Sequence, residues 1–223
     1  MLSLLDRQAI RDGFPLLLPA IPFGFVLGLA MSESAMPIGV AYSSSLFLYA
    51  GAAQLALVTL VGAASAWAVA VAVMVINLRH VMYSAAMAPS FEEQPRWFRI
   101  LAPMFLIDQV FALTSLHTDL EPERFRRYYL TLAAMFYSAW QVLSVLGILF
   151  GALVPTSWGL GFAPALMFAG IVVMMLTNRP AVIAAVVAAA VCFATLGLPN
   201  RSGLLVGALA GISAGFLAES RSR

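Results

Sequence analysis

The chain has 223 residues, of which 62% are hydrophobic and 10% are charged, and its mean hydropathy is +0.96. This composition excludes a soluble globular domain, and the net charge of +2 gives no reason to expect nucleic acid as a partner. No charged residue occurs from Ser34 to Leu78 or from Tyr128 to Asn178. Each run exceeds twice the roughly 20 residues that span a bilayer, so the sequence predicts an all-α, polytopic integral membrane protein among its membrane lipids.

Few side chains are available for metal or covalent chemistry. Cys192 is the only cysteine, and His80 and His117 are the only histidines. We therefore expect no disulfide within the chain, no metal centre and no cofactor. The stretch from Gly211 to Gly215 fits the Gly-x-Ser-x-Gly pattern of serine hydrolases, but it lies in an apolar helix with a glycine at every fourth position. That spacing is typical of helix packing, so we expect no enzyme.

Eight apolar segments follow one another along the chain, and we expect seven to eight of them to cross the membrane. With eight crossings and a cytoplasmic N-terminus, eight loop arginines lie on the cytoplasmic side and three on the other, which fits the positive-inside rule. If the second segment is re-entrant, the count changes to five cytoplasmic arginines against six on the other side. We therefore favour eight crossings with both termini cytoplasmic. The segments lie near residues 14–31, 38–61, 66–86, 100–117, 129–153, 160–176, 180–197 and 202–218.

Two stretches of the chain resemble each other. Gly24 to Gly28 and Gly147 to Gly151 both read Gly-x-x-x-Gly and are both followed by a turn with proline. We expect one transporter domain over residues 1–223, with candidate repeat halves 13–118 and 128–218 in parallel orientation.

The first two segments have features of interrupted helices, because proline removes a backbone donor and serine and glycine permit irregular backbone. The serines either allow close helix packing or line a cavity, whereas we expect the amide of Gln54 to face a cavity. The residues concerned are Pro15, Pro19, Pro22, Ser43, Ser44, Ser45, Gly51 and Gln54.

The third segment carries polar residues at a depth where hydrocarbon would surround them. Arg79 lies about 10 Å from the helix end at 1.5 Å per residue, and a guanidinium there should face protein or water. One interpretation is that Arg79 snorkels to a headgroup. The other is a polar lining of a substrate path, made by Asn77, Arg79, His80 and Tyr83.

The fourth segment contains Asp108 between apolar residues, followed directly by Gln109. A lone carboxylate in hydrocarbon takes up a proton or finds a cation, and Arg79 is the cation at comparable depth. We therefore predict that Arg79 and Asp108 lie within reach of each other and take part in substrate binding and proton coupling.

The stretch from Asn77 to Ser84, with the later Asp108 to Ala112 and the Ala50 to Gln54 segment, resembles the AzlC family. These proteins are the large subunits of bacterial branched-chain amino acid exporters. The resemblance implies proton-driven export of Leu, Ile and Val across the bacterial inner membrane, together with a small AzlD-like membrane subunit and without an ATPase. The family usually has Asp-Glu where this chain has Asp108-Gln109, so proton coupling would depend on Asp108 alone.

Two other functions remain open for such a chain: a membrane channel, and a solute-sensing or scaffold subunit without a transport cycle of its own. For the small subunit, we expect a docking surface on the last helix, provided that Gly24 and Gly28 already pack against Gly147 and Gly151. The expected docking residues are Gly207, Gly211 and Gly215.

Overall fold

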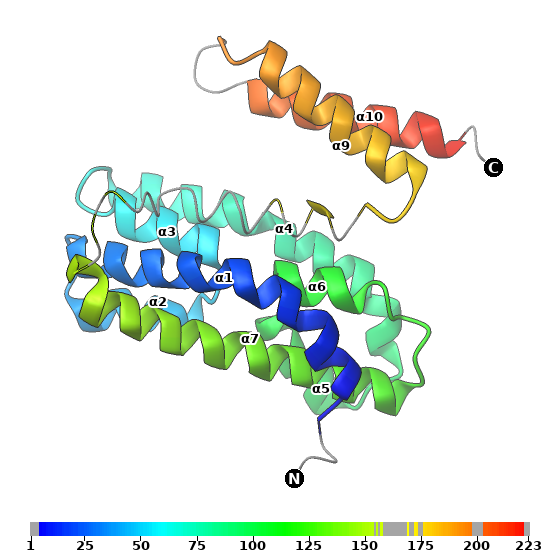
Figure 1. The fold of residues 1–223 in the computed structure, drawn as a ribbon, viewed down its shortest axis with the longest axis horizontal. Helices are drawn as coiled ribbons and strands as arrows, with labels where there is room; N and C mark the ends of the chain where they lie inside the picture. Colours follow the sequence, from blue (N-terminus) through cyan, green and yellow to red (C-terminus); the bar gives the residue numbers. More distant parts are fainter. Residues whose placement is uncertain are drawn as a thin grey trace. The chain divides into compact units, whose positions relative to one another are not determined.

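A computed structural model describes residues 5–153, 176–197 and 203–220, with positions 155, 157, 169, 172 and 173 between them. The described residues form helices and turns, without a β-sheet. They belong to two compact units, Met1–Phe168 and Ala169–Arg223 (Figure 1). The expected helix near 160–176 lies almost wholly outside the described residues.

Three helices of the first unit are long and apolar enough to cross a membrane: α1 (Arg7–Glu33), α4 (Ala66–Glu92) and α7 (Pro122–Phe150). Helices α1 and α7 run parallel, because Asp6 donates its backbone N–H to Thr131 Oγ1 at one end and Gly28 lies against Gly147 at the other. We call the first end the amino end and the opposite one the far end. These helices confirm the expected class of helical membrane protein.

Glycines allow α1 and α7 to approach closely. A Cβ atom on Gly28 would lie 2.8 Å from the Cα of Gly147, and one on Gly24 would lie 2.9 Å from the Cβ of Leu143. On Gly151, which begins the short 3₁₀ helix η3 (Gly151–Leu153), a Cβ would lie 2.7 Å from the Cβ of Leu29. Gly28 and Gly147 therefore meet directly, whereas Gly24 and Gly151 face the leucines of the neighbouring helix. Such small-residue contacts replace the hydrophobic driving force that lipid removes.

The expected interruption of the first segment is wrong, since α1 continues through Pro15, Pro19 and Pro22. The prolines are more exposed than Leu16 and Phe23, which face the core. Each proline removes one backbone donor, and the remaining bonds of a 27-residue helix keep it intact.

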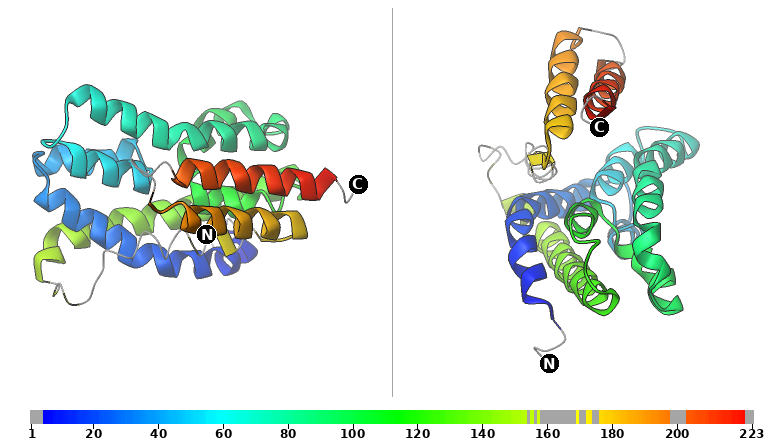
Figure 2. Two further views of the ribbon diagram at one scale, coloured as in Figure 1. Left: turned by 90° about the horizontal axis from the view of Figure 1, so that it is seen from above. Right: turned by 90° about the vertical axis from the view of Figure 1, so that its right-hand side faces the viewer.

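The second segment is a re-entrant hairpin rather than a crossing. It consists of α2 (Ile38–Phe47) and α3 (Gly51–Leu60), separated by a break at residues 48–50. The expected interruption is thus confirmed. A Cβ on Gly62, just after α3, would lie 2.8 Å from the Cβ of Ala35, just before α2. The chain therefore enters and leaves at the far end, as Figures 1 and 2 show, and the expected crossing is wrong.

The fourth segment is a second hairpin, which opens to the amino end. It contains α5 (Arg96–Leu101), the 3₁₀ helix η2 (Ala102–Phe105) and α6 (Asp108–Thr114). Gln94 Nε2 donates to the carbonyl oxygen of Pro122 at 2.9 Å, so the residues before and after the hairpin meet at this end. The expected crossing near 100–117 is wrong too. Helix α4, which joins the two ends, runs antiparallel to α1 and α7.

The tips of the two hairpins meet halfway along α7. The ring centroids of Tyr49 and Phe105, one from each tip, lie 6.4 Å apart. Both rings pack edge-on against Tyr137, at centroid distances of 4.9 and 5.3 Å. The first unit therefore joins three crossing helices with two hairpins of opposite direction.

The second unit contains α9 (Arg179–Ala194) and α10 (Gly203–Ser220). A Cβ on Gly211 would lie 2.7 Å from the carbonyl oxygen of Ala184, and one on Gly215 would lie 2.9 Å from the Cβ of the same alanine. Gly207 faces Cys192 and Ala188. The expectation that this glycine face is left over for another subunit is wrong, because α9 of the same chain covers it.

Candidate functional site

A cavity lies where the two hairpin tips meet the long helices of the first unit. The cavity is partly open, and the empty space between its atoms is ≈ 450 Å³. The centre of a water molecule fits into only ≈ 20 Å³ of this space. That is room for about one water molecule. Its lining comes from α1, the first tip, α4, the second tip and α7, and comprises Leu17, Ala20, Phe23, Tyr49, Ala50, Gly51, Arg79, His80, Ile107, Asp108, Gln109, Phe136, Ala139, Trp140 and Leu143.

An ion pair forms the charged wall of this cavity. Arg79, at the middle of α4, places Nη1 2.9 Å from Oδ2 of Asp108. The side chains are 19% and 10% exposed, so both are largely removed from solvent. Asp108 is the first residue of α6, where the positive end of a helix stabilises a carboxylate. The predicted contact between Arg79 and Asp108 is confirmed, and Arg79 does not snorkel to a headgroup.

Tyr83 holds the second oxygen of the carboxylate. Its hydroxyl donates to Asp108 Oδ1 at 2.6 Å. The Tyr83 ring stacks on Phe111 of α6, with centroids 4.3 Å apart and planes 12° from parallel. His80 approaches the same ring edge-on at 5.7 Å. Asp108 is therefore fixed from two sides, through Oδ2 by a cation and through Oδ1 by a hydroxyl group.

The pair is costly for a membrane protein to maintain. Taking two charges out of water costs several kcal/mol per ion, and a well-packed apolar pair of similar volume is often at least as stable. Charged groups at membrane depth therefore point to function. In the part of the chain that the structure describes, no group of three His, Cys, Asp or Glu side chains could hold a metal ion. The chemistry that this wall offers is the binding of charged groups and of protons.

The tip of the first hairpin has a strained backbone. Tyr49 has φ of 37°, a left-handed conformation that a bulky residue rarely adopts. Such a residue costs about 1–3 kcal/mol and occurs preferentially at functional sites. Two residues later, Gly51 begins α3, and a Cβ there would lie 2.8 Å from the Phe23 ring and 2.9 Å from that of Trp140. A side chain at residue 51 would therefore collide with the cavity wall.

A buried hydrogen-bond network anchors this hairpin to α7. Gln54 Nε2 donates to Ser45 Oγ at 2.9 Å, and Gln54 Oε1 accepts from Trp140 Nε1 at 3.1 Å. Ser45 Oγ donates to Ser144 Oγ at 3.5 Å. Gln54 is completely buried, and its amide serves this network rather than lining the cavity.

The residues predicted for a substrate path are thus only partly brought together. Arg79, His80, Asp108 and Gln109 line the cavity, and Tyr83 binds Asp108. Others do not line it: the hydroxyl groups of Ser43 and Ser44 donate to carbonyl oxygens one turn earlier, and Asn77 Oδ1 is buried without a hydrogen-bond partner among the described residues.

Sequence reasoning missed the aromatic and aliphatic walls, because apolar residues do not stand out in an apolar chain. It also missed the conformation of Tyr49; the only signal was its place directly before Ala50-Gly51. The residues missed are Leu17, Phe23, Tyr49, Phe136 and Leu143.

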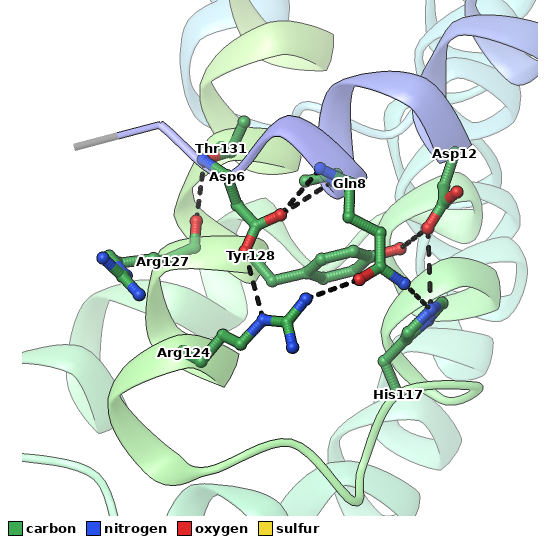
Figure 3. Close-up of polar contacts among 9 residues, drawn as sticks. Asp6, Gln8, Asp12, His117, Arg124, Arg127, Tyr128 and Thr131 are labelled. Carbon is green, nitrogen blue, oxygen red and sulfur yellow. Dashed lines mark hydrogen bonds and ion pairs between the residues drawn. The ribbon is translucent and has the colours of Figure 1, made fainter. Parts of the chain in front are cut away.

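A second polar cluster lies at the amino end (Figure 3). Tyr128 donates to Asp12 Oδ2 at 3.0 Å, and His117 Nε2 lies 3.5 Å from the same oxygen. Arg124 Nη2 donates to Gln8 Oε1 at 2.7 Å, and Arg124 Nε lies 3.7 Å from an oxygen of Asp6. We call these residues the amino-end cluster. It connects the exit of the second hairpin with the first turns of α1 and α7.

The fold and the site define a helical membrane protein with a charged cavity halfway between its ends. The chain belongs to the AzlC family: the family model described as AzlC protein matches residues 15–154, which include both hairpins and every residue that lines the cavity. This membership agrees with the helical membrane protein that the fold defines.

Curated relatives agree with this assignment. A membrane protein of Archaeoglobus fulgidus is 30% identical over 67% of this chain and 64% of its own length. One from Helicobacter pylori is 29% identical over 65% of each chain. The inner membrane protein YgaZ of Escherichia coli K12 is 26% identical over 65% of this chain and 60% of its own. The chain thus spans just under two thirds of these relatives. No solved structure matches it.

Proposed function

We propose that the chain is a secondary exporter of branched-chain and other hydrophobic amino acids, coupled to protons and acting with a small AzlD-like subunit in the bacterial inner membrane. The observation that carries this proposal is the buried pair of Arg79 and Asp108 between the tips of two opposed hairpins. Secondary transporters often bind substrate near the midplane, where discontinuous helices meet.

The two hairpins offer a physical basis for alternating access. The first opens to the far end and the second to the amino end. Movement of either tip away from Tyr137 exposes the cavity to one side of the membrane while the other tip keeps it closed. The centre of a water molecule fits into only ≈ 20 Å³ of the cavity, and this small space corresponds to a state in which both tips are closed.

Arginine placement supports an orientation. In the first unit every arginine except Arg79 belongs to the amino end, and the described far end carries none. The positive-inside rule places such an end in the cytoplasm. The two re-entrant hairpins thus support a cytoplasmic N-terminus, although two of the eight expected crossings are hairpins in the structure. The arginines are Arg7, Arg11, Arg96, Arg99, Arg124, Arg126 and Arg127.

Asp108 is the group that couples transport to protons in this proposal. When Arg79 moves away from this carboxylate at the closed, largely dehydrated site, a proton is the remaining way to neutralise the charge. Gln109 cannot take over, because an amide does not titrate.

Purified chain reconstituted in liposomes, with and without the small subunit, tests the proposal. We expect a proton gradient to drive radiolabelled leucine uphill and unlabelled leucine to produce counterflow. A current proportional to voltage, without counterflow, would identify a channel. Neither activity in the presence of the subunit would identify a sensing or scaffold role. Full export by the chain alone would remove the subunit from the proposal.

A further inference from the structure

We propose that the Arg79–Asp108 pair occupies the places of the substrate's own charges, so that a zwitterionic amino acid binds by separating the pair. The ammonium group of the substrate takes the place of Arg79 on Asp108, and its carboxylate takes the place of Asp108 on Arg79. This inference rests on the proposed function and names the groups that recognise the substrate.

The charge balance of the site favours a zwitterion over either kind of ion. The closed pair is neutral, and both its members line the cavity. A zwitterion gives each of them a new partner and leaves no charge unpaired. An amine alone leaves Arg79 without a counter-ion, and a carboxylic acid alone does the same to Asp108. An unpaired charge at low dielectric is the most unfavourable arrangement.

The geometry allows each member to change its partner. Tyr83 holds Oδ1 of Asp108 and leaves Oδ2, the atom now bound by Arg79, as the place for an ammonium group. Arg79 extends from the middle of α4, and its guanidinium group can bind a carboxylate through two parallel hydrogen bonds. Ala50 and Gly51, at the start of α3, line the same cavity, and the positive end of that helix favours a carboxylate nearby.

The rest of the wall suits an aliphatic side chain. Leu17 and Phe23 of α1 and Phe136 and Leu143 of α7 line the same cavity. The closed cavity has no room for leucine, so binding requires the hairpin tips to separate. Separation of the Arg79–Asp108 pair and opening of the tips therefore occur together, because Asp108 is itself part of the second tip.

Three ligands of the same shape test this assignment: leucine, isoamylamine, which lacks the carboxylate, and isocaproate, which lacks the ammonium group. Binding is measured by titration calorimetry on the purified full chain, with its subunit where required. We expect wild type to prefer leucine over both analogues by about 10- to 100-fold, the range of a lost hydrogen bond to a charged group. Arg79→Gln should reverse the preference toward isoamylamine, and Asp108→Asn toward isocaproate.

Controls separate this result from general damage. Arg124→Gln removes an arginine of the amino-end cluster and should keep the wild-type order of ligands. Arg79→Gln combined with Asp108→Asn removes both charges together and should abolish the preference for leucine, a result that can be measured even if a single variant fails to fold. If the single variants bind leucine and keep the wild-type order of affinities for the three ligands, the inference is overturned and the proposed function stands. Leucine binding without export overturns the proposed function alone, and wild type that does not bind leucine overturns both.

Discussion

The cavity wall and the amino-end cluster use the same kinds of charged groups in opposite ways. At the cavity, Arg79 and Asp108 are 19% and 10% exposed, and the Tyr83 hydroxyl group also binds the carboxylate. In the amino-end cluster, Arg124 is 48% exposed and has both Asp6 and Gln8 as partners. Exposure and alternative partners make a contact replaceable. Depth, rather than charge, therefore distinguishes the ion pair proposed to bind substrate from the pair at the amino end.

The largest effect is expected from removing one member of the buried pair. Arg79→Ala or Asp108→Ala leaves a charge without a partner, which commonly costs about 3–5 kcal/mol of stability. We expect both variants to lose export in liposomes and to melt at lower temperature than wild type. The double alanine variant should melt above either single variant. Additive losses in melting temperature would contradict the energetic coupling of the two residues.

Asp108→Asn should separate flux from the proton gradient. The amide keeps the shape of the side chain but cannot carry a proton, so any leucine flux that remains should be the same with and without a pH difference. Flux is measured in liposomes with imposed gradients, and wild type provides the comparison. If gradient-driven export is undiminished, another group carries the proton, and His80, which also lines the cavity, is the next candidate.

Tyr83→Phe should have an intermediate effect. It removes the 2.6 Å hydrogen bond to Asp108 and retains the stacking on Phe111. A hydrogen bond to a charged group contributes about 1.5–3 kcal/mol, so leucine affinity should fall by about tenfold or more while the protein stays folded. The matched control is Tyr137→Phe, because that hydroxyl group donates to an uncharged carbonyl oxygen, of Leu46, at 3.4 Å. Equal losses of leucine affinity in both variants would show that the hydrogen bond to Asp108 has no specific role in leucine binding.

The smallest effect is expected at the amino end. Arg124→Gln removes an ion pair with an N–O distance of 3.7 Å and a half-exposed arginine. Exposed pairs of this kind contribute about 0–1 kcal/mol, so melting temperature and leucine export should remain close to those of wild type. Loss of export in this variant would show that the cluster at the exit of the second hairpin takes part in transport.

The sequence was sufficient to predict the class of protein and the two residues of the ion pair. Arg79 and Asp108 interrupt long apolar stretches, and the energy of charge in hydrocarbon requires them to meet. The paths of the two hairpins could not be predicted in the same way. Hydropathy measures how apolar a segment is and not whether it returns, and residues 38–61 are long enough to cross.

The return of each hairpin depends on contacts between residues far apart in the chain. Tyr49 adopts its left-handed conformation where Phe105 and Tyr137 pack around it, and no local preference of tyrosine favours that backbone. Gln54 was expected at the cavity because a buried amide needs partners. Its amide group instead forms hydrogen bonds with Ser45 and Trp140. The sequence contains no pattern that predicts these residues to be adjacent to Gln54.

The neutrality of the Arg79–Asp108 pair also determines how the membrane voltage acts on the protein. The field does no net work on the two charges while they move together, so a movement that keeps the pair intact is electrically silent. A proton on Asp108 leaves the guanidinium as one uncompensated positive charge halfway across the membrane. Moving one charge across the whole membrane involves about 2.3 kcal/mol per 100 mV. Any step that carries this charge from the middle to one face therefore involves about half of that energy.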